Sequence, residues 1–150
     1  MNKKFLNLQN ARKKDQIKVM DQIVRDGVCP FCEENFEKYH PKPILFKTKF
    51  WIVTENAWPY NLTKNHFLLV YKPAHIEDSS LVSSEAFGEI NEIIKKLTKN
   101  HELGSGTFLM RFGDMDKSGA TVKHIHAQII EGNPDDPNYD QQIGVVTRVG

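Results

Sequence analysis

The sequence has no long hydrophobic run, almost no excess charge and few cysteines. No apolar stretch approaches the roughly 20 residues of a membrane span, so we expect no membrane-spanning helix. Within residues 1–9, Phe5, Leu6 and Leu8 form too short an apolar core for a signal peptide, which predicts a cytoplasmic protein. The formal net charge of +1 gives no basis for nucleic-acid binding or for attraction to a membrane surface.

The length and composition are those of one folded domain. A chain of 150 residues can bury about 70% of the surface of its unfolded state, so its core needs no disulfide. Hydrophobic residues make up 39% and charged residues 26%, which is typical of soluble domains. We predict a single domain over residues 1–150, with an N-terminal helical extension at 1–27 and a C-terminal tail at 131–150.

Both cysteines belong to one motif, Cys29-Pro-Phe-Cys32. A redox pair of this spacing would open a helix in a βαβ unit, and the sequence predicts no such unit. A zinc finger would place two histidines about twelve residues downstream, whereas His124 is far more distant. The pair is therefore either half of a zinc site that the fold completes or two inert thiols.

The sequence predicts two helices, a short helix or turn, and five strands. The expected helices cover residues 10–25 and 84–100, the short helix or turn covers 33–40, and the expected strands cover 44–46, 50–54, 66–72, 107–112 and 123–130. Helical spacing gives the expected inner faces, which are Ile17, Met20, Ile23 and Val24 in the first helix and Phe87, Ile90, Ile94 and Leu97 in the long one. This order predicts an α+β fold with a mostly antiparallel sheet of about five strands and a long helix packed on it.

One predicted strand carries a row of polar side chains. Side chains alternate faces along a strand, so His124, His126 and Gln128 point one way while the intervening apolar residues point into the core. The preceding loop, residues 113–123, contains glycines, Ser118 and Thr121 and could bind an anion such as phosphate. Alone, two histidines of this spacing are equally often solvated, and a glycine-containing loop is usually a turn.

Four segments together resemble the histidine-triad superfamily. They are Cys29-x-x-Cys32, residues 66–75 (HFLLVYKPAH), Gly119-x-Thr121-x-x-His124, and His124-x-His126-x-Gln128. The family pattern is three histidines alternating with apolar residues, preceded by a glycine and a hydroxyl residue. The match extends over residues 28–131 and implies the histidine-triad fold, a nucleotide substrate and a homodimer.

The resemblance also implies roles for individual residues. His126 matches the nucleophile that attacks a nucleotide α-phosphate and forms a nucleotidyl-histidine intermediate. Thr121 and Gly119 match the phosphate-binding loop, and Asn56 lies where the family contacts the ribose. The zinc-containing members imply a structural zinc site whose four ligands are Cys29, Cys32, His75 and His124. Of the remaining histidines, His66 is expected to lie behind the site or in the core, and His40 and His101 are expected on the surface.

Three positions depart from the common pattern. Gln128 replaces the third histidine, as in galactose-1-phosphate uridylyltransferase and the dinucleoside-polyphosphate phosphorylases, which favours transfer or phosphorolysis over hydrolysis. Its amide can donate to a phosphate oxygen but cannot act as an acid, which suits a leaving group that is stable as an anion. Arg111 stands in place of a family asparagine and is expected to contact the substrate, and Ala120 replaces the glutamine of many hydrolases.

Two other functions fit parts of the sequence. A cupin-like metal enzyme would use His124, His126 and Glu131 on one open metal site, although the predicted helices argue against its all-β fold. A catalytically weak nucleotide-binding module held together by zinc would explain the departures at Arg111 and Gln128.

Overall fold

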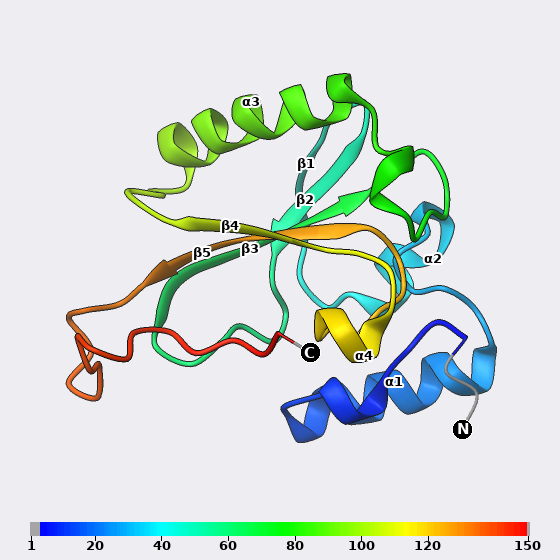
Figure 1. Cartoon of the computed structure of the whole chain (residues 1–150), viewed down its shortest axis with the longest axis horizontal. Coiled ribbons are helices and arrows are strands. Elements are labelled where there is room, and N and C mark those ends of the chain that lie inside the picture. Colours follow the sequence, from blue (N-terminus) through cyan, green and yellow to red (C-terminus); the bar gives the residue numbers. More distant parts are fainter. Residues whose placement is uncertain (1–3, 150) are drawn as a thin grey trace.

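The computed structural model describes residues 4–149, which form a five-stranded antiparallel sheet with helices on both faces (Figure 1). The strand order is β1-β2-β3-β5-β4, and the predicted α+β class is confirmed. In chain order the elements are η1 (Leu8–Asn10), α1 (Lys14–Asp26), α2 (Glu33–Tyr39), β1 (Ile44–Lys47), β2 (Trp51–Glu55), β3 (Thr63–Tyr71), η2 (Ser79–Leu81), α3 (Ser84–Asn100), β4 (Thr107–Arg111), α4 (Met115–Ser118) and β5 (His126–Gly132). Residues 1–3 and 150 of the expected extension and tail lie outside the described residues. No helix within residues 4–149 is long and apolar enough to cross a membrane.

Strand β5 lies between β3 and β4 and is therefore hydrogen-bonded along both edges. His126 is paired with Val70 of β3 and with Arg111 of β4. A slip of one residue would exchange the two faces of the strand, so a strand held on both sides keeps its register. The centre of the sheet is thus a rigid base for the side chains of β5.

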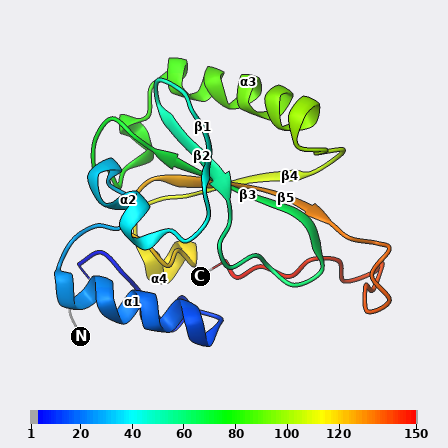
Figure 2. The same ribbon diagram turned by 180° about the vertical axis from the view of Figure 1, so that it is seen from behind.

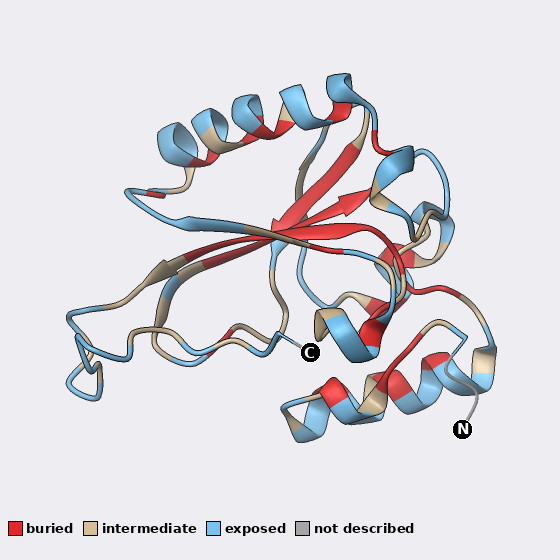
Figure 3. Ribbon diagram, viewed as in Figure 1, coloured by how far each residue is buried: buried red, intermediate tan, exposed pale blue. Residues whose placement is uncertain are grey.

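Helix α3 covers one face of the sheet and forms the main core with it (Figures 1 and 3). Ser83 caps this helix by accepting a hydrogen bond from the backbone N–H of Ala86. The buried residues of α3 are Ala86, Ile90, Ile93 and Leu97, and they share the core with Ile125, Ala127 and Ile129. The expected inner face was wrong at Phe87, which is 42% exposed, because the buried stripe is rotated by one residue toward Ala86 and Ile93.

Helices α1 and α4 lie on the opposite side of the sheet from α3 (Figures 1 and 2). Gly27 ends α1 in the left-handed conformation, with φ of 67°, which a glycine adopts without steric cost. Met20 and Ile23 are buried as expected, whereas Ile17 and Val24 are exposed. The buried side of α1 includes Gln16 instead, because this helix faces a partly polar site and not only the core.

The polar segment 113–123 is not a plain loop, because it contains the short helix α4. The sequence predicted that the final strand begins at Lys123, but it begins at His126. The cause is the N-terminal segment: Val122 forms a β-bridge with Leu6, and the backbone N–H of Lys123 donates to the carbonyl of Phe5 at 2.8 Å. Residues 122–123 therefore pair with the start of the chain and not with the sheet.

The last described residues return toward the centre of the sheet. The guanidinium of Arg111 donates to the Thr147 hydroxyl and to the carbonyl of Arg148, both at 2.9 Å. The C-terminal segment thereby reaches the same face of the sheet as α1.

Candidate active site and metal centre

His126 projects from β5 on the face opposite α3 and is only 4% exposed. Its Nδ1 lies 2.7 Å from the carbonyl oxygen of His124. A carbonyl can only accept a hydrogen bond, so Nδ1 carries the proton and Nε2 keeps an unprotonated lone pair. Burial lowers the pKa of His126 to about 4. The imidazole is therefore neutral near pH 7, in the tautomer that a nucleophile at Nε2 requires.

The amide of Gln128 is oriented by His66 of the neighbouring strand β3. The backbone N–H of Tyr60 donates to Nδ1 of His66 at 3.0 Å, which places the imidazole proton on Nε2. This Nε2–H donates to Oε1 of Gln128 at 2.7 Å. Because Oε1 is occupied, the NH₂ group of Gln128 is the end of the amide that remains to donate to a substrate. Burial lowers the pKa of His66 to about 4, so its single proton is fixed in this arrangement near neutral pH.

Gly119 allows the loop before the histidines to approach two other segments closely. Its φ is 68°, and a side chain there would place Cβ 2.6 Å from the Arg148 carbonyl and 2.8 Å from Nη1 of Arg111. Thr121, two residues later, directs its hydroxyl to the carbonyl of Asn10 at 3.5 Å. Both residues lie where the resemblance placed the phosphate-binding loop, and both line the same cavity as His126.

Arg111 is almost fully buried, with 5% exposure, and binds several groups of the chain itself. Its guanidinium donates to the Ser118 carbonyl, to the hydroxyl of Tyr60 at 3.0 Å, and to the C-terminal segment described above. Arg111 therefore holds the 113–123 loop and residues 147–148 together. Its positive charge also adds to the effect of burial in lowering the pKa of His126.

These side chains surround one cavity between the sheet, α1 and the two chain ends. Its volume is about 100 Å³, which is below the roughly 300–1,000 Å³ of typical small-molecule sites. Asn56 lines the cavity, and its Oδ1 accepts a hydrogen bond from the Trp58 backbone at 2.9 Å. Apolar walls come from α1 and from Phe31, whose ring meets that of His126 edge-on at 5.2 Å.

The expectation that His40 is a surface residue was wrong. It is half-buried, stacks on Phe36 with ring centroids 4.8 Å apart, and lies 3.1 Å from both the Glu55 carbonyl and the Thr54 hydroxyl. Burial lowers its pKa to about 4. Phe36 and His40 are four residues apart, about one helical turn, and this spacing in the sequence could have indicated the contact between their rings. His101 lies at the end of α3 beside Phe67 and does not line the cavity.

The structure excludes the cupin-like arrangement. Glu131 accepts hydrogen bonds from the Asn65 amide at 2.7 Å and from the backbone of Ser105 at 3.2 Å. Among residues 4–149, the group of histidine, cysteine and acidic side chains that could hold a metal contains His124 but neither Glu131 nor His126.

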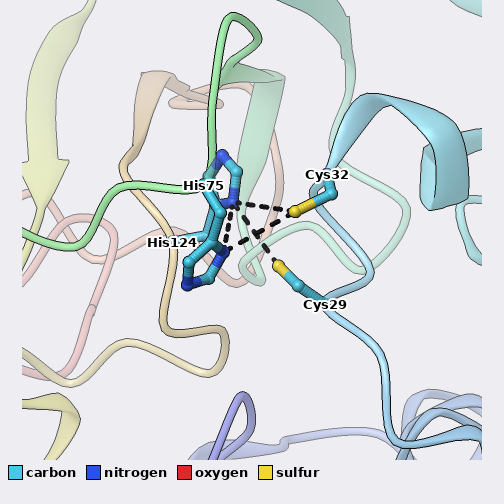
Figure 4. A group of neighbouring side chains, drawn as sticks. All are labelled: Cys29, Cys32, His75 and His124. Carbon is cyan, nitrogen blue, oxygen red and sulfur yellow. Dashed lines mark hydrogen bonds between the residues drawn. The ribbon is translucent and has the colours of Figure 1, made fainter.

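Four side chains from three separate parts of the chain converge beside β5 (Figure 4). They are Cys29, Cys32, His75 and His124, and their ligand atoms all lie within 4.8 Å of one another. The closest pairs are His75 Nδ1–His124 Nδ1 at 3.2 Å, Cys29 Sγ–His124 Nδ1 at 3.4 Å and Cys32 Sγ–His75 Nδ1 at 3.6 Å. A tetrahedral zinc ion would separate such atoms by roughly 3.3–3.8 Å, so the four residues have the right size and donor set for one.

The protonation of the two histidines also fits a metal ion. Nε2 of His124 donates to the carbonyl of Tyr71 at 2.7 Å, and Nε2 of His75 lies 3.2 Å from the Glu77 carboxylate. Both rings therefore carry their proton on Nε2 and direct an unprotonated Nδ1 at the two thiols. Lys123 pairs with the same Glu77 carboxylate at 2.8 Å and holds it in place. Burial raises the pKa of the Cys32 thiol to about 12, so its thiolate needs a neighbouring cation to form near neutral pH.

No protein-family model and no curated protein matches the sequence. Solved structures do match the fold. A histidine-triad nucleotide-binding protein from Candida albicans is 18% identical with a TM-score of 0.59, and the alignment covers 82% of each chain. A zinc-bound histidine-triad protein from Mycobacterium smegmatis is 15% identical with a TM-score of 0.54, covering 74% of this chain and 79% of that one. The diadenosine triphosphate hydrolase of Plasmodium falciparum is 19% identical with a TM-score of 0.50, covering 67% of each chain. These likenesses confirm the resemblance at the level of architecture: the chain has the histidine-triad fold.

Proposed function

We propose that this chain is a nucleotide-processing enzyme in which Nε2 of His126 attacks the α-phosphate of a nucleotide. The observation that supports this most directly is the hydrogen bond from Nδ1 of His126 to the His124 carbonyl, which leaves Nε2 as the nucleophilic atom in the cavity. The structural neighbours add support, because one is described as a nucleotide-binding protein and another as a diadenosine triphosphate hydrolase.

The reaction proceeds by two displacements. The Nε2 lone pair forms a bond to phosphorus while the bond from phosphorus to the leaving oxygen breaks, and the leaving group departs with the electron pair. The Nδ1 proton stays on the ring, hydrogen-bonded to the His124 carbonyl, and stabilises the positive charge that the imidazole gains. An acceptor oxygen then attacks the same phosphorus while the bond from phosphorus to Nε2 breaks, which releases neutral His126, and any proton on the acceptor passes to solvent water.

Gln128 stabilises the charge that develops on the phosphate. Its NH₂ group is the free end of an amide whose oxygen is already bound by His66, so it is oriented before substrate arrives. A preorganised donor of this kind contributes about 3–4 kcal/mol to transition-state stabilisation. Because an amide cannot supply a proton, we propose that the preferred leaving group is stable as an anion and that transfer to phosphate competes with hydrolysis.

We further propose that Cys29, Cys32, His75 and His124 hold a structural zinc ion. Zinc with four protein ligands has no open position for substrate, so its chemistry here is to neutralise the thiolates and hold the segments together. His124 is both a proposed ligand and the residue whose carbonyl binds His126, so the site connects the Cys29–Cys32 segment to the nucleophile.

The test is covalent capture of the intermediate. Wild-type protein is mixed with diadenosine triphosphate, quenched within milliseconds to seconds, and measured by intact-protein mass spectrometry. We expect a gain of one adenylyl group, mapped to His126 by peptide sequencing. His126→Ala should show no adduct and should lose activity by more than a factor of a thousand. His101→Ala removes a histidine outside the cavity and should keep both. Product formation by wild type without any adduct would contradict the mechanism, and nucleotide binding without turnover would make the protein a binding module.

A further inference from the structure

The N-terminal segment, residues 5–12, is bound along the loop that precedes His124. It lies outside residues 28–131, which carry the resemblance to histidine-triad proteins. The hydrogen bonds that join the segment to the loop include Lys123 N to Phe5 O at 2.8 Å, Asn7 N to Thr121 O at 2.9 Å and Asn10 Nδ2 to Ala120 O at 2.7 Å. The amides of a buried asparagine and of the backbone are thus used to hold this segment beside the proposed phosphate site.

Arg12, at the end of this segment, lies at the mouth of the cavity. Its backbone N–H donates to Oε1 of the buried Gln16 at 3.0 Å, which fixes the position of its Cα. Its guanidinium lies over the ring of Tyr60, with Cζ 4.0 Å from the ring centroid, and Nη2 donates to the carbonyl of Trp58 at 2.7 Å. A guanidinium has five N–H donors, so this single bond within residues 4–149 leaves most of them for a ligand.

The charge of the cavity lining is entirely positive within the described part of the chain. Its charged residues are Arg12, Arg111 and Arg148, and no aspartate or glutamate lines it. No ion pair within residues 4–149 involves Arg12 or Arg111. Asp15, in the first turn of α1 and three residues after Arg12, accepts a hydrogen bond from the Trp58 indole at 3.1 Å. The whole chain has 20 basic and 19 acidic residues, so positive charge is concentrated in this cavity, and this favours a ligand with several negative charges.

Tyr60 connects Arg12 with Arg111, because its ring lies under the Arg12 guanidinium and its hydroxyl accepts a hydrogen bond from Arg111 at 3.0 Å. The charge of Arg111 lowers the pKa of His126, the proposed nucleophile. The charge of Arg12, together with that of Arg111, lowers the pKa of His66, which holds Gln128. The Tyr60 ring that lies under the Arg12 guanidinium also packs against the His66 ring, with centroids 4.6 Å apart, so Arg12 lies on the side of the cavity where His66 holds Gln128.

We propose that the Arg12 guanidinium binds a phosphate group of the substrate other than the one that His126 attacks. The N-terminal segment is then a part of the substrate site, and it selects nucleotides that carry two or more phosphates. A guanidinium matches the geometry of a phosphate and binds it with charge-assisted hydrogen bonds. This inference rests on the proposed function for the identity of the attacked phosphate.

The test compares two ligands that differ by one phosphate. Isothermal titration calorimetry measures Kd for AMP and for α,β-methylene ADP, whose bridging carbon prevents cleavage between the two phosphorus atoms. The variants are Arg12→Gln, which removes the positive charge, and Arg12→Lys, which keeps the charge but lacks the planar guanidinium group. Arg25→Gln is the matched control, since Arg25 lies on the exposed side of α1 and contacts only Gln22 among the described residues.

We expect wild type to bind α,β-methylene ADP more tightly than AMP, and Arg12→Gln to weaken the diphosphate at least tenfold while changing AMP less than twofold. Arg12→Lys should recover part of the loss, and Arg25→Gln should behave as wild type. The proposal would be overturned if Arg12→Gln weakened both ligands equally. It would also be overturned if wild type bound the two ligands with equal affinity, or bound neither. Arg12-dependent selectivity without an adduct on His126 would leave this inference standing and would instead refute the covalent mechanism.

Discussion

The hydrogen bond between His66 and Gln128 permits a sharp test with two nearly isosteric substitutions. His66→Asn can keep an acceptor near the position of Nδ1, so the Tyr60 N–H remains bound, but it loses the donor to Gln128. His66→Gln can place an N–H near the position of Nε2 and keep the contact with Gln128. The two variants therefore separate the role of His66 in packing from its role in orienting the amide.

The expected magnitude follows from the geometry of the contact. His66 is 5% exposed and its Nε2 lies 2.7 Å from Oε1 of Gln128, so the lost hydrogen bond leaves a buried acceptor without a partner. Such a loss costs about 1–3 kcal/mol. Rotation of the amide relieves this cost but turns its NH₂ group away from the phosphate. Because the proposed function gives that donor its role in the transition state, kcat should fall by roughly 10- to 100-fold in His66→Asn, with little change in KM.

The assay is the rate of adenylyl adduct formation in a single turnover, followed by quenched-flow mass spectrometry. His66→Gln should stay within about fivefold of wild type, and Gln128→Leu should match His66→Asn, because both remove the same donor. Combining His66→Asn with Gln128→Leu should cost no more than either alone. Full activity of His66→Asn beside an impaired Gln128→Leu would refute the orientation argument.

Three further outcomes test other parts of the molecule. Elemental analysis should find about one zinc per chain, and Cys29→Ser should lower both the metal content and the thermal stability. A metal-free chain of full stability would contradict the four-ligand site. Added phosphate should speed product formation and give a nucleoside diphosphate, while a rate indifferent to phosphate with only monophosphate released would assign hydrolysis. His40 has a pKa of about 4 in the folded chain and near 6.5 when unfolded, so its contribution to stability is complete above pH 6.5 and falls as the pH drops toward 4. By pH 5.5 His40 alone should account for a loss of about 1.4 kcal/mol in the free energy of unfolding, and His40→Gln should reduce the pH dependence by that amount in urea titrations between pH 7 and 5. An unchanged slope in that variant would show that His40 is not buried in its neutral form.

The site could be located from the sequence because a strand has a strict period of two. His126 and Gln128 share a face of β5, and the apolar residues between and beside them lie in the core with α3. The predicted bounds of α3, 84–100, are confirmed because a serine cap and a long apolar stripe mark that helix locally. The convergence of the Cys29–Cys32 motif with His75 and His124 came from the family resemblance and not from local pattern, since these residues are up to 95 positions apart.

The sequence did not reveal the features that depend on contacts between distant segments. Ile17 and Val24 of α1 were expected in the core, but the partner of this helix is a cavity with polar walls, so its buried side is shifted toward Gln16. The start of β5 was placed too early because the pairing of Leu6 with Val122 has no signature in either segment. Arg12 carried no motif at all, and only its position beside Tyr60 connects it with the site. The expected homodimer stays a prediction.

The β-bridge between Leu6 and Val122 also bears on how the protein is made. During synthesis on a ribosome, residues 5–12 leave the exit tunnel before residues 113–123 are translated, so the segment has to wait for these partners. Closing so long a loop is slow compared with forming a helix or a hairpin. Strands β1 to β3 and helix α3 can form from nearer neighbours, whereas the loop at 113–123 and strand β5 come later, and only then can the loop bind residues 5–12. A nascent chain should therefore form its local elements first and complete the cavity beside His126 only after residues 113–132 have been made.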